Sequence, residues 1–208
     1  MKNRKIKLLP GAVALLVLLP FSSLSAQRIQ LSPFLGYETG AKINTSLGSL
    51  HIEDGMDFGA ILNVGIGGGR YAELSYSHLG TELSTDHEAT YTPVCDLAVD
   101  YYSLGMLQEL KPAEKTTPYG LLTLGVVNYR PTSGDISGEN KVHISLAGGV
   151  KTKLSEKIGL RFQARLLLPL YYAGTYFTFG TGGTGYGISG GIHGVQGDFT
   201  GAVVVTLK

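Results

Sequence analysis

Apolar and polar side chains alternate on both sides of a short turn in residues 142–168. In the second arm every second residue is apolar, whereas Arg161, Gln163 and Arg165 lie between the apolar positions. Successive side chains of a strand point to opposite faces, so this arm has one apolar and one polar face. The first arm alternates in the same way, and the link over residues 155–159 ends in glycine. The stretch therefore predicts an antiparallel β-hairpin.

The same period of two recurs along the chain and predicts eight strands. They cover residues 29–37, 56–66, 71–79, 98–110, 118–129, 142–154, 160–170 and 198–207. The connections between them alternate between long, at about 12 to 27 residues, and short, at about 4 to 7 residues. In an up-and-down topology all the long connections lie at one end. Membrane barrels have this arrangement, with long extracellular loops and short periplasmic turns.

Two architectures fit such strands. A soluble barrel turns the apolar faces inward, whereas a membrane barrel turns them outward against lipid. The sorting of loops by length favours the membrane barrel. Composition agrees, because only 16% of the residues are charged, glycine (30) and tyrosine (12) are abundant, and tyrosines gather at strand ends as in an interfacial girdle. The prediction is an all-β, eight-stranded antiparallel up-and-down transmembrane β-barrel, with a secreted soluble barrel as the alternative.

The first 26 residues predict an export signal. Four basic residues precede an apolar run over residues 8–19, and small residues at 22–26 suit cleavage after Ala26. A retained membrane anchor is the alternative. Residues 27–208 then form the barrel and keep 13 of the 17 basic residues against 16 acidic ones. This balance leaves no basic surface for nucleic acid, so no nucleic-acid partner is expected.

If the apolar faces meet lipid, the polar faces line the interior. The predicted inward side chains with charges or amides are Asp57, Glu73, Glu109, Lys151, Arg161, Gln163 and Arg165. Eight strands leave an interior just wide enough for side chains to fill, and an unpaired charge there costs several kcal/mol. Both signs of charge are present, which predicts a plug of ion pairs and hydrogen bonds. A narrow passive path for ions or small solutes through the same residues is the alternative.

Enzymatic chemistry finds little support in the sequence. Ser77 and His78 are adjacent and therefore point to opposite faces of their strand. His143 and Ser145 share a face, but no third catalytic group accompanies them. The glycines at 67–69 form a turn, because no Lys-Ser/Thr pair and no helix follow them as in a phosphate loop. The protein is predicted not to be an enzyme, and a lipid-modifying hydrolase is the weaker alternative.

Metal and redox chemistry are equally unsupported. Cys95 is the single cysteine, which excludes an intrachain disulfide and predicts a free thiol, with an intermolecular bridge as the alternative. His51, Asp54, His87 and His193 fall in polar connections without metal-ligand spacing. No metal and no cofactor are therefore expected.

The segments PYGLLTLGVVNY and SLAGGVKTKLSEKIGLRFQARL, followed by a terminal alternating strand, carry a family resemblance. In this pattern the mature chain resembles the small outer-membrane β-barrels of the OmpA transmembrane-domain and OmpX type. The resemblance implies a place in the outer membrane of a Gram-negative bacterium, with outer-membrane lipid and the barrel-assembly machinery as partners. The final residues, Thr206-Leu207-Lys208, depart from the aromatic ending common in that family.

Fold and composition together predict a role in the cell envelope. We expect a structural or surface-interaction protein whose polar side chains fill the interior and whose four long loops meet an extracellular ligand. The glycine-rich segment 180–197 is interpreted as a surface loop, with ligand binding as an alternative role. A porin-like narrow channel is the second interpretation.

Overall fold

The computed structural model describes residues 28–45, 48–87, 90–110, 115–133, 138–180, 183–192 and 195–207. The predicted signal segment lies outside the described residues. The strands are β1 (Ile29–Glu38), β2 (Ala41–Thr45), β3 (Gly48–Ile52), β4 (Gly55–Gly67), β5 (Arg70–His87), β6 (Thr90–Glu109), β7 (Thr116–Pro131), β8 (Glu139–Lys153), β9 (Ile158–Gly180), β10 (Gly183–Ile192) and β11 (Gln196–Thr206). Within the described residues, no helix is long and apolar enough to cross a membrane.

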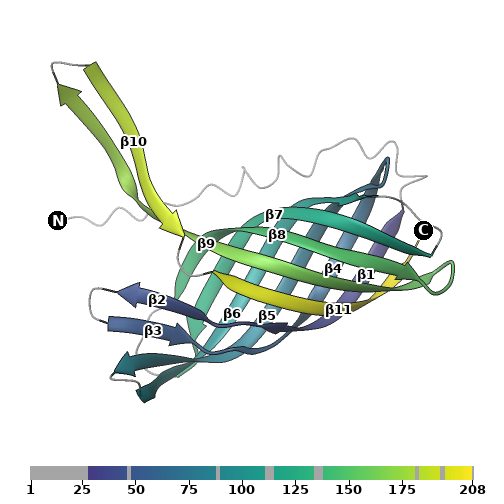
Figure 1. Ribbon diagram of the computed structural model, residues 1–208, viewed down its shortest axis with the longest axis horizontal. Coiled ribbons are helices and arrows are strands. Elements are labelled where there is room, and N and C mark those ends of the chain that lie inside the picture. The colour runs from purple at the N-terminus through teal and green to yellow at the C-terminus, as the bar shows by residue number, and fades with distance from the viewer. Residues whose placement is uncertain are drawn as a thin grey trace, which may run out of the picture.

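Eight of these strands close into an antiparallel barrel (Figure 1). The order around the wall is β1, β4, β5, β6, β7, β8, β9 and β11, and β11 pairs back with β1. The other three strands lie outside the wall: β2 pairs with β3, β3 with the far part of β5, and β10 with the far part of β9. The predicted eight-stranded antiparallel barrel is confirmed.

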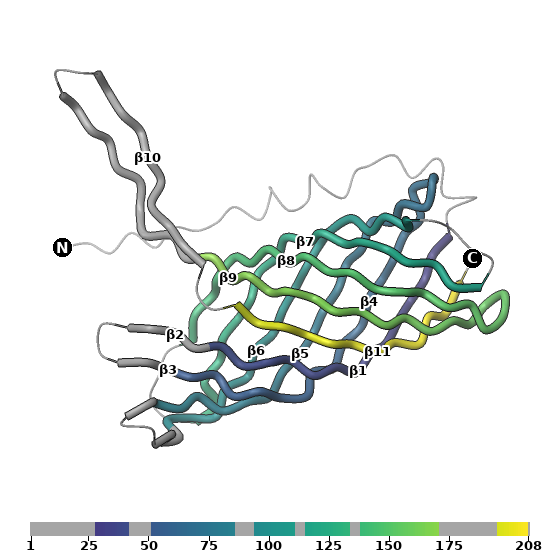
Figure 2. Tube along the Cα trace, viewed as in Figure 1, coloured from purple at the N-terminus to yellow at the C-terminus, as the bar shows by residue number. Residues whose placement is uncertain are grey.

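The two ends of the barrel differ in their connections. The end with the short β4–β5, β6–β7 and β8–β9 turns also holds the start of β1 and the end of β11, and we call it the turn end (Figures 1 and 2). Gly67, Gly68 and Gly69 make the tightest of these turns with φ of 93°, 63° and 71°, a region that other residues avoid. The opposite end, from which β2, β3 and β10 extend, is the loop end.

Several connections predicted to be irregular contain strands. Residues 38–55 include β2 and β3, residues 80–97 continue β5 and β6, and residues 171–197 continue β9 and include β10. These parts lie largely beyond the apolar belt of the wall, and their sequence shows no regular alternation of apolar and polar residues. Their backbones still pair, because a ladder satisfies the N–H and C=O groups whichever side chains it carries.

The wall is apolar outside and polar inside. Leu35, Met56, Leu122 and Phe199 on the outer face are 63%, 65%, 58% and 61% exposed. These and other outward side chains form an apolar belt, made up of Leu35, Met56, Phe58, Leu74, Leu104, Leu122, Leu124, Leu146, Phe162, Leu166, Phe199 and Val203. A soluble barrel does not expose so large an apolar surface, so the apolar faces meet lipid, and the transmembrane prediction is confirmed.

Apolar side chains also enter the interior, in three small clusters. The largest lies toward the loop end and contains Ile52, Leu79, Leu97, Val99, Tyr101, Val127 and Leu167. A second contains Tyr71, Leu107, Tyr119, Leu121 and Ala147, and a third contains Phe34, Ile61 and Ala202. Phe34, Leu121 and Val127 blur the sequence alternation because they are apolar on the inward face. Cys95 is buried and free.

Candidate functional site

A bidentate ion pair spans the lumen between β9 and β5. Arg161 donates from its two terminal nitrogens to Glu73 Oε2 at 2.8 Å and Oε1 at 3.1 Å. Both side chains are almost completely buried, with 1% and 2% of their surface exposed. Two parallel hydrogen bonds between charged groups fix the orientation of both side chains as well as adding energy.

Three neutral side chains complete this arrangement. Arg161 Nε donates to the Tyr119 hydroxyl at 2.8 Å, and that hydroxyl donates to Gln163 at 3.0 Å. Asn63 donates to Glu73 at 2.7 Å, and Arg161 also donates to Asn63 and to Gln163. We call these five residues the turn-side network. Because every member is hydrogen-bonded, the network forms a packed polar layer instead of a water-filled one.

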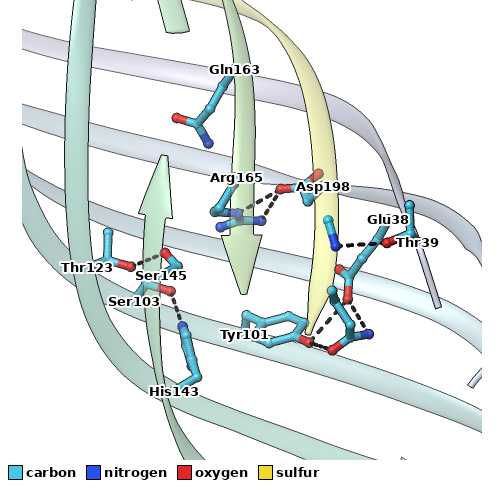
Figure 3. A network of polar contacts seen from close by, with 12 residues as sticks. Glu38, Thr39, Tyr101, Ser103, Thr123, His143, Ser145, Gln163, Arg165 and Asp198 are labelled. Carbon is cyan, nitrogen blue, oxygen red and sulfur yellow. Dashed lines mark hydrogen bonds and ion pairs between the residues drawn. The ribbon is translucent and has the colours of Figure 1, made fainter. Parts of the chain in front are cut away.

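A second polar group lies nearer the loop end (Figure 3). Arg165 pairs with Asp198 through contacts of 2.7 Å and 2.6 Å. Gln196 donates to Glu38 at 2.9 Å, and the Tyr101 hydroxyl lies 2.8 Å from Gln196 and 3.1 Å from Glu38. We call these five residues, together with Asp57, the loop-side network.

Asp57 differs from the other members of the loop-side network. Its side chain is fully buried, and neither carboxylate oxygen has a hydrogen-bond partner in the described protein. Glu38 and Asp198 each have one further oxygen without a partner. The network thus contains three carboxyl groups and one guanidinium. No group of three or more His, Cys, Asp or Glu side chains in the described residues is arranged to hold a metal ion.

Hydroxyl groups and an imidazole fill the adjoining layer (Figure 3). His143 Nε2 lies 2.9 Å from the Ser103 hydroxyl, and its ring meets the Tyr101 ring edge-on at 5.1 Å. The Ser145 hydroxyl lies 2.5 Å from Thr123 Oγ1. His143 and Ser145 share a face, as their spacing predicts, but they have separate partners: Thr123 lies on the neighbouring strand β7, and Ser103 lies one strand further on β6.

The predicted interior charges therefore do not form one network. Glu73 and Arg161 belong to the turn-side network, and Asp57 and Arg165 to the loop-side network. Lys151 and Glu109 are not hydrogen-bonded members of either network and line an open cavity at the turn end. The division follows their depth along the strands, which the alternation of the sequence does not encode.

This mouth cavity has a volume of about 630 Å³. Its charged lining residues are Arg28, Glu109, Lys151, Lys153 and Glu156. Lys151 is the most deeply buried of them, at 8% exposure, and donates to Gln30 at 3.2 Å. Its ammonium also lies 4.3 Å from the centre of the Tyr71 ring, a cation–π distance.

A polar cluster on the outer face was not predicted. Asp100 Oδ1 accepts from the Tyr76 hydroxyl at 2.9 Å and lies 2.7 Å from His78 Nδ1. Asp100 Oδ2 accepts from Arg130 at 3.0 Å and 2.5 Å. Asp100 shares its face with Tyr102, which is 54% exposed, so following the alternation within the predicted strand 98–110 from Tyr102 to the preceding position on that face would have found it. Ser77 faces the interior and is buried, on the opposite face from His78 as predicted.

Outside the barrel wall, Asp54 joins the chain before β2 to the start of β4. Its carboxylate accepts from the Gly40 amide at 2.8 Å and from the Tyr37 hydroxyl at 3.1 Å. These two hydrogen bonds lower the pKa of Asp54 below its ordinary value. His51 lies 3.8 Å from Glu53. The side chains of His87 and His193 lie outside the described residues.

Solved structures of other proteins have the same architecture. Neisserial surface protein A matches with a TM-score of 0.56 and 13% identity, over 87% of this chain and 97% of that protein. The outer membrane protein OprG from Pseudomonas aeruginosa matches with a TM-score of 0.57 and 10% identity, over 86% and 92% of the two chains. This chain has the fold of a small outer-membrane β-barrel.

A third outer-membrane barrel agrees. The outer membrane protein AlkL, whose structure was determined in lipid bilayers, matches with a TM-score of 0.52 and 10% identity, over 87% of this chain and 90% of that one. No family model and no curated protein matches the sequence. At these identities the likeness lies in the fold of the barrel alone.

Proposed function

We propose that the protein is a non-conducting outer-membrane barrel that anchors an interaction surface, with the turn end in the periplasm and the loop end outside the cell. The observation that carries this proposal is the Arg161–Glu73 pair, which spans the lumen with 1% and 2% of its side-chain surface exposed. If a water-filled path ran through this layer, the side chains of Arg161 and Glu73 would be more exposed to solvent than they are. The apolar cluster toward the loop end adds a second barrier, in which Leu79, Val127 and Leu167 are fully buried.

At the loop end the described strands extend beyond the apolar belt as paired ladders, which supports the surface-interaction part of the proposal. The β2–β3 hairpin is tied to β5 through its backbone pairing and through Glu53, whose carbonyl accepts from Thr81 at 2.6 Å. Ser84 donates to the Glu53 carboxylate at 2.5 Å. The β5–β6 ladder continues to the pair His87–Thr90, well beyond the apolar belt. A paired, hydrogen-bonded scaffold loses less entropy on binding a partner than free loops do.

Single-channel recording tests whether the barrel conducts. The purified full-length protein, reconstituted into a planar lipid bilayer in 1 M KCl, is expected to insert without conductance steps. Insertion is verified independently by heat-modifiable gel mobility of protein recovered from the same vesicles. Reproducible steps from the folded band would refute the sealed interior and favour the narrow channel, with the mouth cavity as its entrance.

A further inference from the structure

The mouth cavity at the turn end is large enough for a small molecule. Its volume of about 630 Å³ falls in the usual range for ligand pockets. Seven of the eight barrel strands contribute to its lining, through Gln30, Tyr71, Glu109, Thr117, Lys151, Leu160 and Val204. Lys151 pairs across the β8–β9 ladder with Arg161, so the turn-side network borders the cavity at that point. The cavity opens at the turn end, which the proposed function places in the periplasm.

Lys151 is a buried cation with neutral partners. Its ammonium contacts the Gln30 amide oxygen at 3.2 Å and the rings of Tyr71 and Tyr119 at 4.3 Å and 5.7 Å. It makes no ion pair with any residue that the structure describes. The nearest interior carboxylate network is already engaged, because Glu73 takes two hydrogen bonds from Arg161. A buried ammonium is stabilised most by an anion in direct contact. Glu109 lines the same cavity, but among the described residues no carboxylate forms an ion pair with Lys151.

The other charges of the cavity are arranged by depth. Arg28 and Lys153 are exposed at the mouth and add to the positive charge around the opening. The two carboxylates, Glu109 and Glu156, lie at the rim: Glu109 beside the glycine turn after β4, and Glu156 in the exposed turn after β8. The deepest charge is thus positive, and an anion that reaches Lys151 passes the carboxylates at the edge of the opening.

We propose that the mouth cavity binds a small organic anion from the periplasm, with its carboxylate or phosphate on Lys151. Gln30 offers a polar neighbour for the anionic head, and Tyr71 and Val204 offer an apolar wall for the rest of the solute. Because the turn-side network borders the cavity at Lys151, the solute is held and not passed on. This site goes beyond the proposed function, which concerns the loop end and the sealed lumen.

Calorimetric titration of the folded, full-length protein in an uncharged detergent at low ionic strength tests the site. Succinate and inorganic phosphate serve as separate probes, so that carboxylate and phosphate preferences are distinguished. Saturable one-to-one binding of at least one probe is expected, and Lys151→Gln is expected to weaken it about tenfold or more. Lys151→Arg, which keeps the charge, is expected to retain most of the affinity.

Lys157→Gln is the matched control, because Lys157 is an exposed lysine of the neighbouring turn that does not line the cavity. It is expected to bind the probe like the unaltered protein. If neither probe saturates the unaltered protein, or if both glutamine variants weaken binding equally, the proposal is wrong. If Lys151→Gln fails to fold, Arg28→Gln at the mouth takes its place and is expected to weaken binding several-fold. Conductance is measured in a separate experiment. A conducting barrel would refute the sealed lumen, whereas only the binding titrations decide whether the mouth cavity binds an anion.

Discussion

At the scale of single residues, the Arg161–Glu73 pair shows how a narrow barrel tolerates charge. The guanidinium and the carboxylate are both removed from water, and each satisfies the other through two hydrogen bonds. Tyr119, Asn63 and Gln163 occupy the remaining donors and acceptors. Removing one charge therefore leaves the other buried without its counter-ion, which costs more than removing the whole pair.

Single and double substitutions at this pair are expected to differ. Arg161→Ala should lower the free energy of unfolding by about 3–5 kcal/mol, because Glu73 then remains buried without its counter-ion. The apolar double variant Arg161→Met/Glu73→Leu should lower the free energy of unfolding clearly less than the single variant does. Urea titration in lipid vesicles, followed by heat-modifiable gel mobility, measures both. Equal losses for the single and double variants would mean that packing volume matters here and charge pairing does not.

At the scale of elements, Asp54 fastens the first hairpin to the barrel wall. Its carboxylate bridges the Gly40 amide and the Tyr37 hydroxyl, so the end of β1 and the approach to β4 are held together. The folded pKa of Asp54 lies below its ordinary value, with the Gly40 amide as the main cause. The stabilisation is therefore present above the unfolded pKa, about 3.9, and is lost as the pH falls through the folded pKa.

Amide exchange at Gly40 reports this contact. Its protection factor is expected to fall several-fold when the pH is lowered from 6 to below the folded pKa of Asp54. Asp54→Asn should show the lower protection already at pH 6 and little further change on acidification. Amides within the β7–β8 ladder provide the internal reference. Unchanged Gly40 protection in both experiments would show that the hairpin is held by its β3–β5 pairing alone.

The elements also show what the sequence can and cannot predict. Period-two alternation located all eight wall strands, because in those parts one face meets lipid and the other the interior. It did not find β10 or the continuation of β5 to His87, because the sequence there does not alternate between apolar and polar residues. It predicted that Arg161 and Glu73 face inward but not that they pair. Their strands lie on opposite sides of the barrel, so their meeting depends on its stagger.

At the scale of the whole molecule, the usual distribution of side chains is inverted. Leu104 and Leu124 pair across β6 and β7 on the outer face, with 54% and 57% of their surface exposed, whereas Ser103 and Thr123 beside them are buried. The interior therefore gains its stability from polar contacts and small apolar clusters, and the exterior gains its stability from lipid. The stability of the folded barrel consequently depends on the surrounding bilayer and not on a single apolar core.

Arginine substitutions at two depths test the placement of the belt. Leu104→Arg, in the middle of the belt, is expected to lower the free energy of unfolding in vesicles by about 2–4 kcal/mol. Leu154→Arg, at the turn end, should cost at most about 1 kcal/mol, because the charge reaches the interface there. The two leucines are similarly exposed, at 54% and 61%. If Leu154→Arg lowered the free energy of unfolding more than Leu104→Arg, the membrane would lie nearer the turn end than the belt indicates.

The pairing of β1 with β11 bears on the order in which the chain can assemble. All other neighbours in the wall are consecutive wall strands, whereas this seam joins Gln30 to Thr206 and Glu38 to Asp198. It cannot form until the last strand is in place, so any arrangement of the wall before that point is an open sheet with two free edges. Two unpaired edges in a bilayer are prohibitively costly, so the final ladder commits the chain to the membrane in one late step.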